Sequence, residues 1–151
     1  MAINTPASEN AGQGSLKKSP TRYLTIVARV LLGLLFFVFG LNGFLHFIPQ
    51  PTKPMPEGAA AFAGALMNTG YMFPLIMGVQ LLVGVLLLVN RFVPLALALI
   101  APIIVGIITF HLFLAPSGML PGIIALVLEL YLAWAYRSAF RPMLALRVTP
   151  D

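Results

Sequence analysis

Polar side chains inside otherwise apolar stretches are the first candidates for chemistry in this chain. They are Arg29, Asn42, His46, Gln80, His111 and Glu129. An ionisable group at bilayer depth costs at least about 2.5–3.5 kcal/mol on insertion scales, so such a residue usually has a partner or a function. Guanidinium, carboxyl and imidazole groups suit proton transfer, ligand binding or an ion pair that fixes helix packing.

One group of these residues is predicted to lie at similar depth toward one membrane surface. At a rise of about 1.5 Å per residue, Arg29, Gln80 and Glu129 lie roughly 9–15 Å from the ends of their stretches. Each shares a helix face with small residues, which favours contact with another helix. We expect an inner polar cluster in which Arg29 pairs with Glu129 and Gln80 completes the hydrogen bonds. This cluster is either a structural ion pair or a proton or redox-cofactor site.

The outer group comprises Asn42, His46 and His111. Asn42 and His46 are four positions apart and share a helix face, and His46 and His111 lie at similar depth near the outer ends of their stretches. Imidazole can relay protons, ligate haem iron or hydrogen-bond a quinone carbonyl. Two histidines are too few for a closed zinc site of about four ligands, so no metal site is predicted. A bis-histidine haem has no supporting motif, and interfacial histidines with hydrated tips are the alternative.

Long apolar stretches must position these residues, and they cover residues 23–48, 71–89, 92–114 and 119–137. Each reaches or nearly reaches the ~20 residues that span a hydrocarbon core of about 30 Å. Hydrophobic residues make up 60% of the 151 residues and charged residues only 9%, against about 25% in soluble domains. The sequence predicts an all-α polytopic membrane protein, with an antiparallel four-transmembrane-helix bundle over residues 21–144.

The connections between the stretches differ in length. Asn90 with Arg91, and the segment 116–118, are tight turns that force antiparallel neighbours. The proline-rich segment 49–56 excludes a helix, and residues 58–67 predict a short extra helix in the same external loop. Residues 1–20 are expected to form a disordered cytoplasmic tail, and residues 145–151 a short C-terminal tail.

The distribution of Lys and Arg predicts the orientation. If both termini lie on one side, that side holds Lys17, Lys18, Arg22, Arg91, Arg137, Arg141 and Arg147, and the other side holds only Lys53. The positive-inside rule then places both termini in the cytoplasm. The net charge of +5 therefore indicates a membrane surface, not nucleic acid. The absence of cysteine excludes disulfides and thiolate chemistry.

Several segments form a recognisable pattern: Arg29, Gly33, Phe36, Gly40 and Asn42 in the first stretch, residues 78–84 and 90–91, and residues around His111 and 128–137. This pattern resembles the DoxX-like family of small membrane proteins. It covers residues 23–144 and implies a four-helix bundle in a bacterial or archaeal cytoplasmic membrane. It also implies a link to quinone reduction or to oxidative-stress complexes. Gln80 stands where the family often has an acid, and Gly43 where it often has a base.

Three functions fit these observations. The first is a quinone-associated redox or oxidative-stress membrane subunit, in which buried polar groups bind the quinone head while its tail stays in lipid. The second is a non-catalytic structural or assembly protein. The third is a small proton-coupled transporter, which would need oligomerisation because four spans without an inverted repeat are few for alternating access. The expected partners are the lipid bilayer, a quinone (with haem as the alternative), other membrane or redox subunits and a second copy of the chain.

Overall fold

The computed structural model describes residues 20–49 and 54–145. Helices account for 84% of these residues, and no strand occurs among them. The tails predicted for residues 1–20 and 145–151 lie outside the described residues, apart from Pro20 and Ala145. The helices are α1 (Pro20–Leu45), α2 (Glu57–Asn68), α3 (Met72–Leu88), α4 (Val93–Phe113), α5 (Met119–Ala135) and α6 (Arg137–Phe140), with 3₁₀ turns η1 (Pro116–Gly118) and η2 (Pro142–Leu144).

Each predicted apolar stretch contains one long helix, and the predicted helix of the first loop is α2. The first stretch differs at its end, because α1 stops at Leu45 and not at Ile48. The backbone N–H of Ile48 donates to Asn42 Oδ1 at 2.7 Å, and His46 adopts a left-handed conformation with φ of 52°. The Asn42 side chain thus replaces the last helical hydrogen bonds and turns the chain out of the helix.

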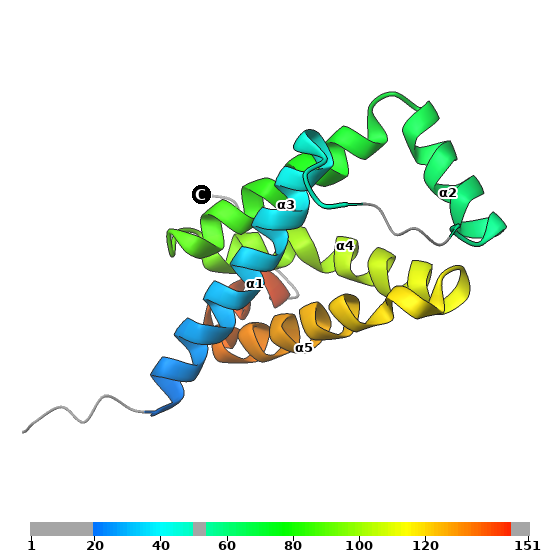
Figure 1. Cartoon of the computed structure of the whole chain (residues 1–151). Coiled ribbons are helices and arrows are strands. Elements are labelled where there is room, and N and C mark those ends of the chain that lie inside the picture. Colours follow the sequence, from blue (N-terminus) through cyan, green and yellow to red (C-terminus); the bar gives the residue numbers. More distant parts are fainter. Residues whose placement is uncertain (1–19, 50–53, 146–151) are drawn as a thin grey trace, which may run out of the picture.

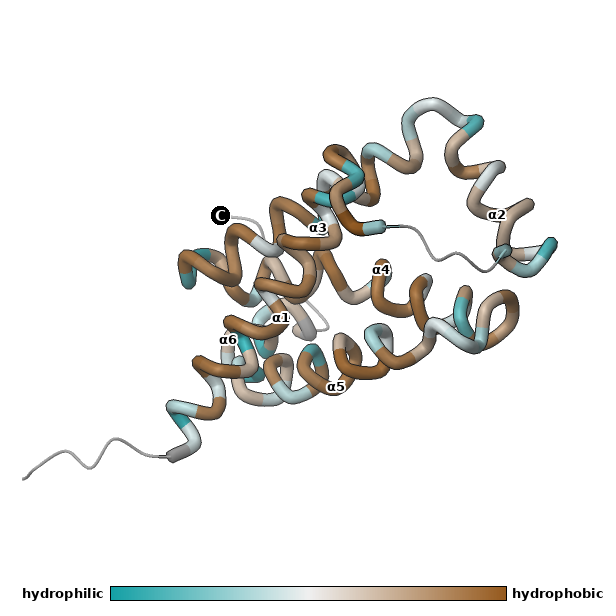
Figure 2. Tube along the Cα trace, in the orientation of Figure 1, coloured by the Kyte–Doolittle hydropathy of each residue, from teal (hydrophilic) through white to brown (hydrophobic). Residues whose placement is uncertain are grey.

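Three helical segments are long and apolar enough to cross a membrane: Thr21–Leu45, Val93–Phe113 and Pro116–Ala135. The number rises to four if α2 and α3, which bend by 90° at the short break between them, count as one span. Many large apolar side chains face outward along these helices, and Phe113 is 76% exposed. Figure 2 shows the same pattern, with hydrophobic residues along the helices and hydrophilic ones mostly near their ends. Such a surface suits lipid and not water.

The helices pack around one apolar core. α1 packs most extensively on α3, α4 lies beside α5, and further contacts join α1 to α5 and α3 to α4 (Figure 1). The largest fully buried side chains are Phe36, Leu32, Leu87, Leu97, Ile100, Ile104, Leu132 and Val83. At the N-terminal end of α3, α2 turns back toward α4. The ring centroids of Phe62 on α2 and Phe110 on α4 lie 5.6 Å apart.

Candidate functional site

The polar candidates differ in burial. Arg29, Gln80 and Glu129 are 8%, 5% and 6% exposed, and they are the buried polar side chains of the described part of the chain. Asn42 and His111 are half-buried, whereas His46 is exposed just past the end of α1. The predicted contact face of Glu129 is confirmed, because the buried residues of α5 are Gly122, Ala125, Glu129 and Leu132.

A cavity of about 410 Å³ lies between α1, α3, α4 and α5 and brings together residues from both predicted groups. Asn42, Gln80 and His111 line it from α1, α3 and α4. The large apolar side chains of its wall are Leu35, Phe36, Phe39, Phe73, Met77 and Ile107. Gln80 therefore belongs with Asn42 and His111, whereas His46 does not line this cavity. The prediction that Asn42 and His46 share a helix face is wrong, because α1 ends at Leu45 and His46 lies outside it.

His111 is held in a defined orientation at the edge of the cavity. Its Nδ1 lies 3.0 Å from the carbonyl oxygen of Ala115. Because a carbonyl can only accept, Nδ1 carries the proton of this hydrogen bond, and Nε2 of the neutral ring keeps its lone pair for another partner. Gly118 lies against the ring, since a Cβ at this position would be 2.5 Å from His111 Cε1. The Phe110 ring meets the imidazole edge-on, at 5.2 Å between centroids.

The two amides leave hydrogen-bonding capacity in the cavity. Asn42 Oδ1 accepts a hydrogen bond from Ile48 N–H. The Asn42 Nδ2 group donates no hydrogen bond to any residue that the structure describes. The Gln80 side chain likewise makes no hydrogen bond within residues 20–49 and 54–145, although it is only 5% exposed. A largely apolar cavity thus carries amide donors and one imidazole nitrogen, as ligand-binding cavities commonly do.

The predicted inner cluster does not form as expected. The Arg29 guanidinium donates through Nη1 to the carbonyl oxygen of Leu87, near the C-terminus of α3. Glu129 Oε2 is buried without a hydrogen-bond partner, and no ion pair joins it to Arg29 in the described residues. The physical reason is that the last carbonyls of a helix carry the negative end of its dipole, so they attract a nearby guanidinium. Arg29 instead lines a second cavity.

Residue types alone do not predict the partners of Arg29 and His111, because both partners are backbone carbonyls. The Ala115 carbonyl carries a weak signal, since it lies four residues after His111 at the end of an apolar stretch. Leu87 lies 58 positions from Arg29 and carries no such signal.

No protein-family model matches the chain, and no curated protein or solved structure matches it. The resemblance to DoxX-like proteins stays a prediction. The three polar groups of the cavity can hydrogen-bond a flat apolar molecule that carries oxygen atoms.

Proposed function

We propose that the chain is a quinone-binding protein of the cytoplasmic membrane, and a DoxX-like subunit of a redox or oxidative-stress complex. One observation carries the proposal: Asn42, Gln80 and His111 reach one apolar cavity from three different helices. A quinone head has the matching chemistry, because it is a flat apolar ring with carbonyl oxygens at its edges. Amide N–H groups would donate to these oxygens.

The size and wall of the cavity support this ligand class. Small-molecule cavities measure about 300–1,000 Å³, and this one measures about 410 Å³. Phe36, Phe39 and Phe73 line it and offer aromatic surfaces against which a ring can pack. A bound quinone supplies two-electron, two-proton redox chemistry. His111 Nε2 would be the group that exchanges a proton with a bound quinone or quinol, because Nδ1 is already engaged by the Ala115 carbonyl.

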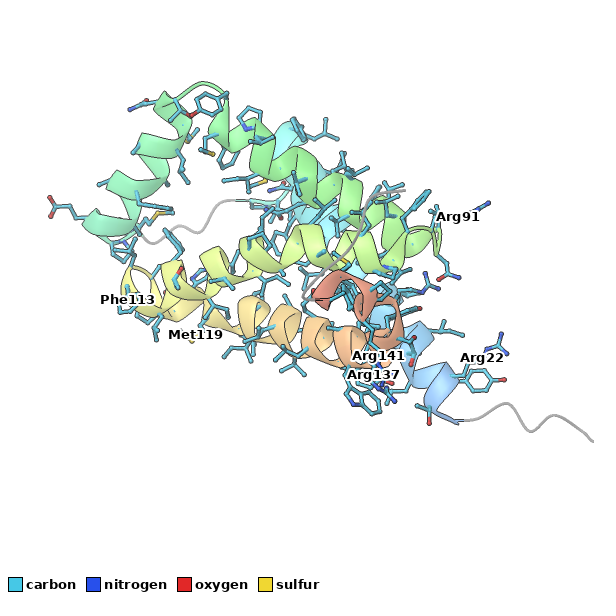
Figure 3. All side chains as sticks on the ribbon, turned by 180° about the vertical axis from the view of Figure 1, so that it is seen from behind. Arg22, Arg91, Phe113, Met119, Arg137 and Arg141 are labelled. Carbon is cyan, nitrogen blue, oxygen red and sulfur yellow. The ribbon has the colours of Figure 1, made fainter. Side chains whose placement is uncertain are left out.

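The proposed membrane arrangement has four antiparallel spans, α1, α3, α4 and α5, with α2 in the external loop and both termini in the cytoplasm. The 17 residues of α3 cover about 25 Å, a mismatch that a bilayer accommodates at modest cost. Figure 3 supports this arrangement, because Arg22, Arg91, Arg137 and Arg141 lie at one end of the molecule and Phe113 and Met119 at the other. The cavity that Asn42, Gln80 and His111 line, the His111 cavity, then lies in the outer half of the membrane.

The test is the binding of a short-tailed quinone to the purified full chain in mild detergent. We expect His111→Ala and Gln80→Leu each to weaken binding by about tenfold, the equivalent of one lost hydrogen bond. His46→Ala is the matched control and should bind as the wild type does, because His46 is an exposed histidine outside the cavity. Equal losses in His46→Ala and His111→Ala, or no loss in either cavity variant, would refute the proposal.

A non-catalytic structural or assembly function is the second candidate. It is supported by the bond from Arg29 to Leu87, which gives a buried charge a helix-capping role instead of a chemical one. Under this alternative the protein purifies without quinone, and the cavity variants change its thermal stability but bind no less ligand than the wild type. The same set of variants therefore separates the two candidates.

A further inference from the structure

The second cavity lies at the arginine-rich end of the molecule and measures about 330 Å³. Arg22, Thr25 and Arg29 line it from α1, Asn90 from the turn between α3 and α4, and Tyr136 from the end of α5. Arg22 and Arg29 are two helical turns apart, so they share one face of α1. Segments far apart in the sequence thus close around two guanidinium groups.

The positive charge of this cavity has no acidic partner among the described residues. No carboxylate lines it, and Glu129 Oε2 makes no hydrogen bond in the described residues. Arg29 uses Nη1 for Leu87, but a guanidinium has five N–H donors. Arg137, at the same end, is engaged elsewhere: its guanidinium lies 4.8 Å from the centre of the Trp134 ring.

The donors in the cavity suit a phosphate group. Arginine binds phosphate through paired N–H donors, and the Asn90 amide and Tyr136 hydroxyl can add two neutral donors. Thr25 contributes less, because its hydroxyl already bonds to the Thr21 carbonyl and the Tyr131 hydroxyl, each at 3.0 Å.

The surroundings indicate that this phosphate belongs to a lipid. Ile26 lines the cavity and is 42% exposed, so apolar surface begins beside the charged groups. An acyl chain can follow that surface while the head group stays at the interface. We propose that the second cavity binds the phosphodiester of an anionic membrane phospholipid, with Arg22 and Arg29 as its charge partners. This site is separate from the His111 cavity and does not depend on quinone binding.

The experiment compares lipid binding to the delipidated full chain in neutral detergent by native mass spectrometry. Phosphatidylglycerol should bind more tightly than phosphatidylcholine with the same acyl chains. Arg22→Gln should weaken phosphatidylglycerol binding by about tenfold, because one charge-assisted contact is lost. Arg29→Lys keeps the charge but loses the paired donors, and should weaken it as well. If Arg29→Lys fails to fold, exposed Arg22 still provides the test.

Arg91→Gln is the matched control, because Arg91 is exposed at the same end but does not line the cavity. It should bind phosphatidylglycerol as the wild type does. An equal loss in Arg91→Gln would overturn the proposal in favour of diffuse surface charge. Equal affinity for the two lipids would overturn it too. Displacement of the lipid by inorganic phosphate at similar concentration would show a site for soluble phosphate instead.

Discussion

Arg29 and Glu129 are buried groups of opposite charge whose surroundings differ. The Arg29 guanidinium donates to the Leu87 carbonyl, whereas Glu129 Oε2 has no hydrogen-bond partner. A buried polar group without a partner keeps its full desolvation cost, and a bonded one recovers part of it. Loss of the two side chains should therefore have unequal effects on stability.

We expect Arg29→Met to lower the free energy of unfolding by about 1–3 kcal/mol, because it removes the charge-assisted hydrogen bond to the Leu87 carbonyl, which then keeps only the longer 3.3 Å bond from Asn90 N–H. Glu129→Gln should be neutral or stabilising, since it removes a buried ionisable group that lacks a bonded partner. Thermal unfolding of both variants in the same detergent measures the difference. The double variant serves as the control and should resemble Arg29→Met. Losses of about 3–5 kcal/mol in both single variants, with recovery in the double variant, would instead show a buried ion pair.

The buried faces of these side chains were predictable, but their bonds were not. Helical periodicity places Arg29, Gln80 and Glu129 on buried faces, and all three are buried. Which neighbour a long side chain reaches depends on the rotation and offset of the helices, which apolar periodicity does not specify. Gln80 lines the His111 cavity for this reason, although its depth suggested a place beside Arg29.

At the scale of elements, the contact between α1 and α3 depends on two glycines. A Cβ on Gly40 would lie 2.5 Å from the backbone nitrogen of Leu81, and one on Gly84 would lie 2.6 Å from the Cα of Phe37. Both neighbours are backbone atoms that cannot move aside like a flexible side chain. The two helices therefore approach as closely as only glycine permits.

Gly84→Ala and Gly40→Ala should each destabilise the protein by about 1–3 kcal/mol, because the added methyl group forces the helices apart. Gly78→Ala on the same helix α3 is the control. No atom lies within 4 Å of a Cβ at that position, so this change should be neutral or stabilise by up to about 1 kcal/mol through helix propensity. The measurement is thermal unfolding in detergent. Equal effects at Gly78 and Gly84 would mean that close packing does not hold α1 against α3.

The elements themselves could be predicted more fully than their ends. Long apolar runs locate α1, α3, α4 and α5, and the Ala-rich segment locates α2. The end of α1 differs because the Asn42 side chain bonds to Ile48 N–H, and that bond moves His46 out of the helix. A single capping hydrogen bond thus keeps His46, a predicted cofactor-binding residue, out of the cavity.

At the scale of the whole molecule, the same helices line two separate cavities. One is the His111 cavity, and the other is the arginine cavity, which is lined by Arg22 and Arg29. The face of α5 passes from Gly122 and Ala125, which line the His111 cavity, to Tyr136, which lines the arginine cavity. Glu129 lies between them on this face. The proposed functions of the two cavities depend on which membrane surface each one faces.

The distribution of charge predicts the orientation of the molecule in the membrane. Arg22, Arg91, Arg137 and Arg141 lie at one end of the molecule (Figure 3), and moving these charges across a membrane is unfavourable, so that end should remain cytoplasmic. A reporter that is active only outside the cytoplasm should be silent when fused after Asp151 and active when inserted at Lys53. A reporter active only in the cytoplasm, at the same two positions, is the control and should give the opposite pattern. If the first reporter were active after Asp151, the His111 cavity would face the cytoplasm, and the arginine cavity would meet the outer leaflet.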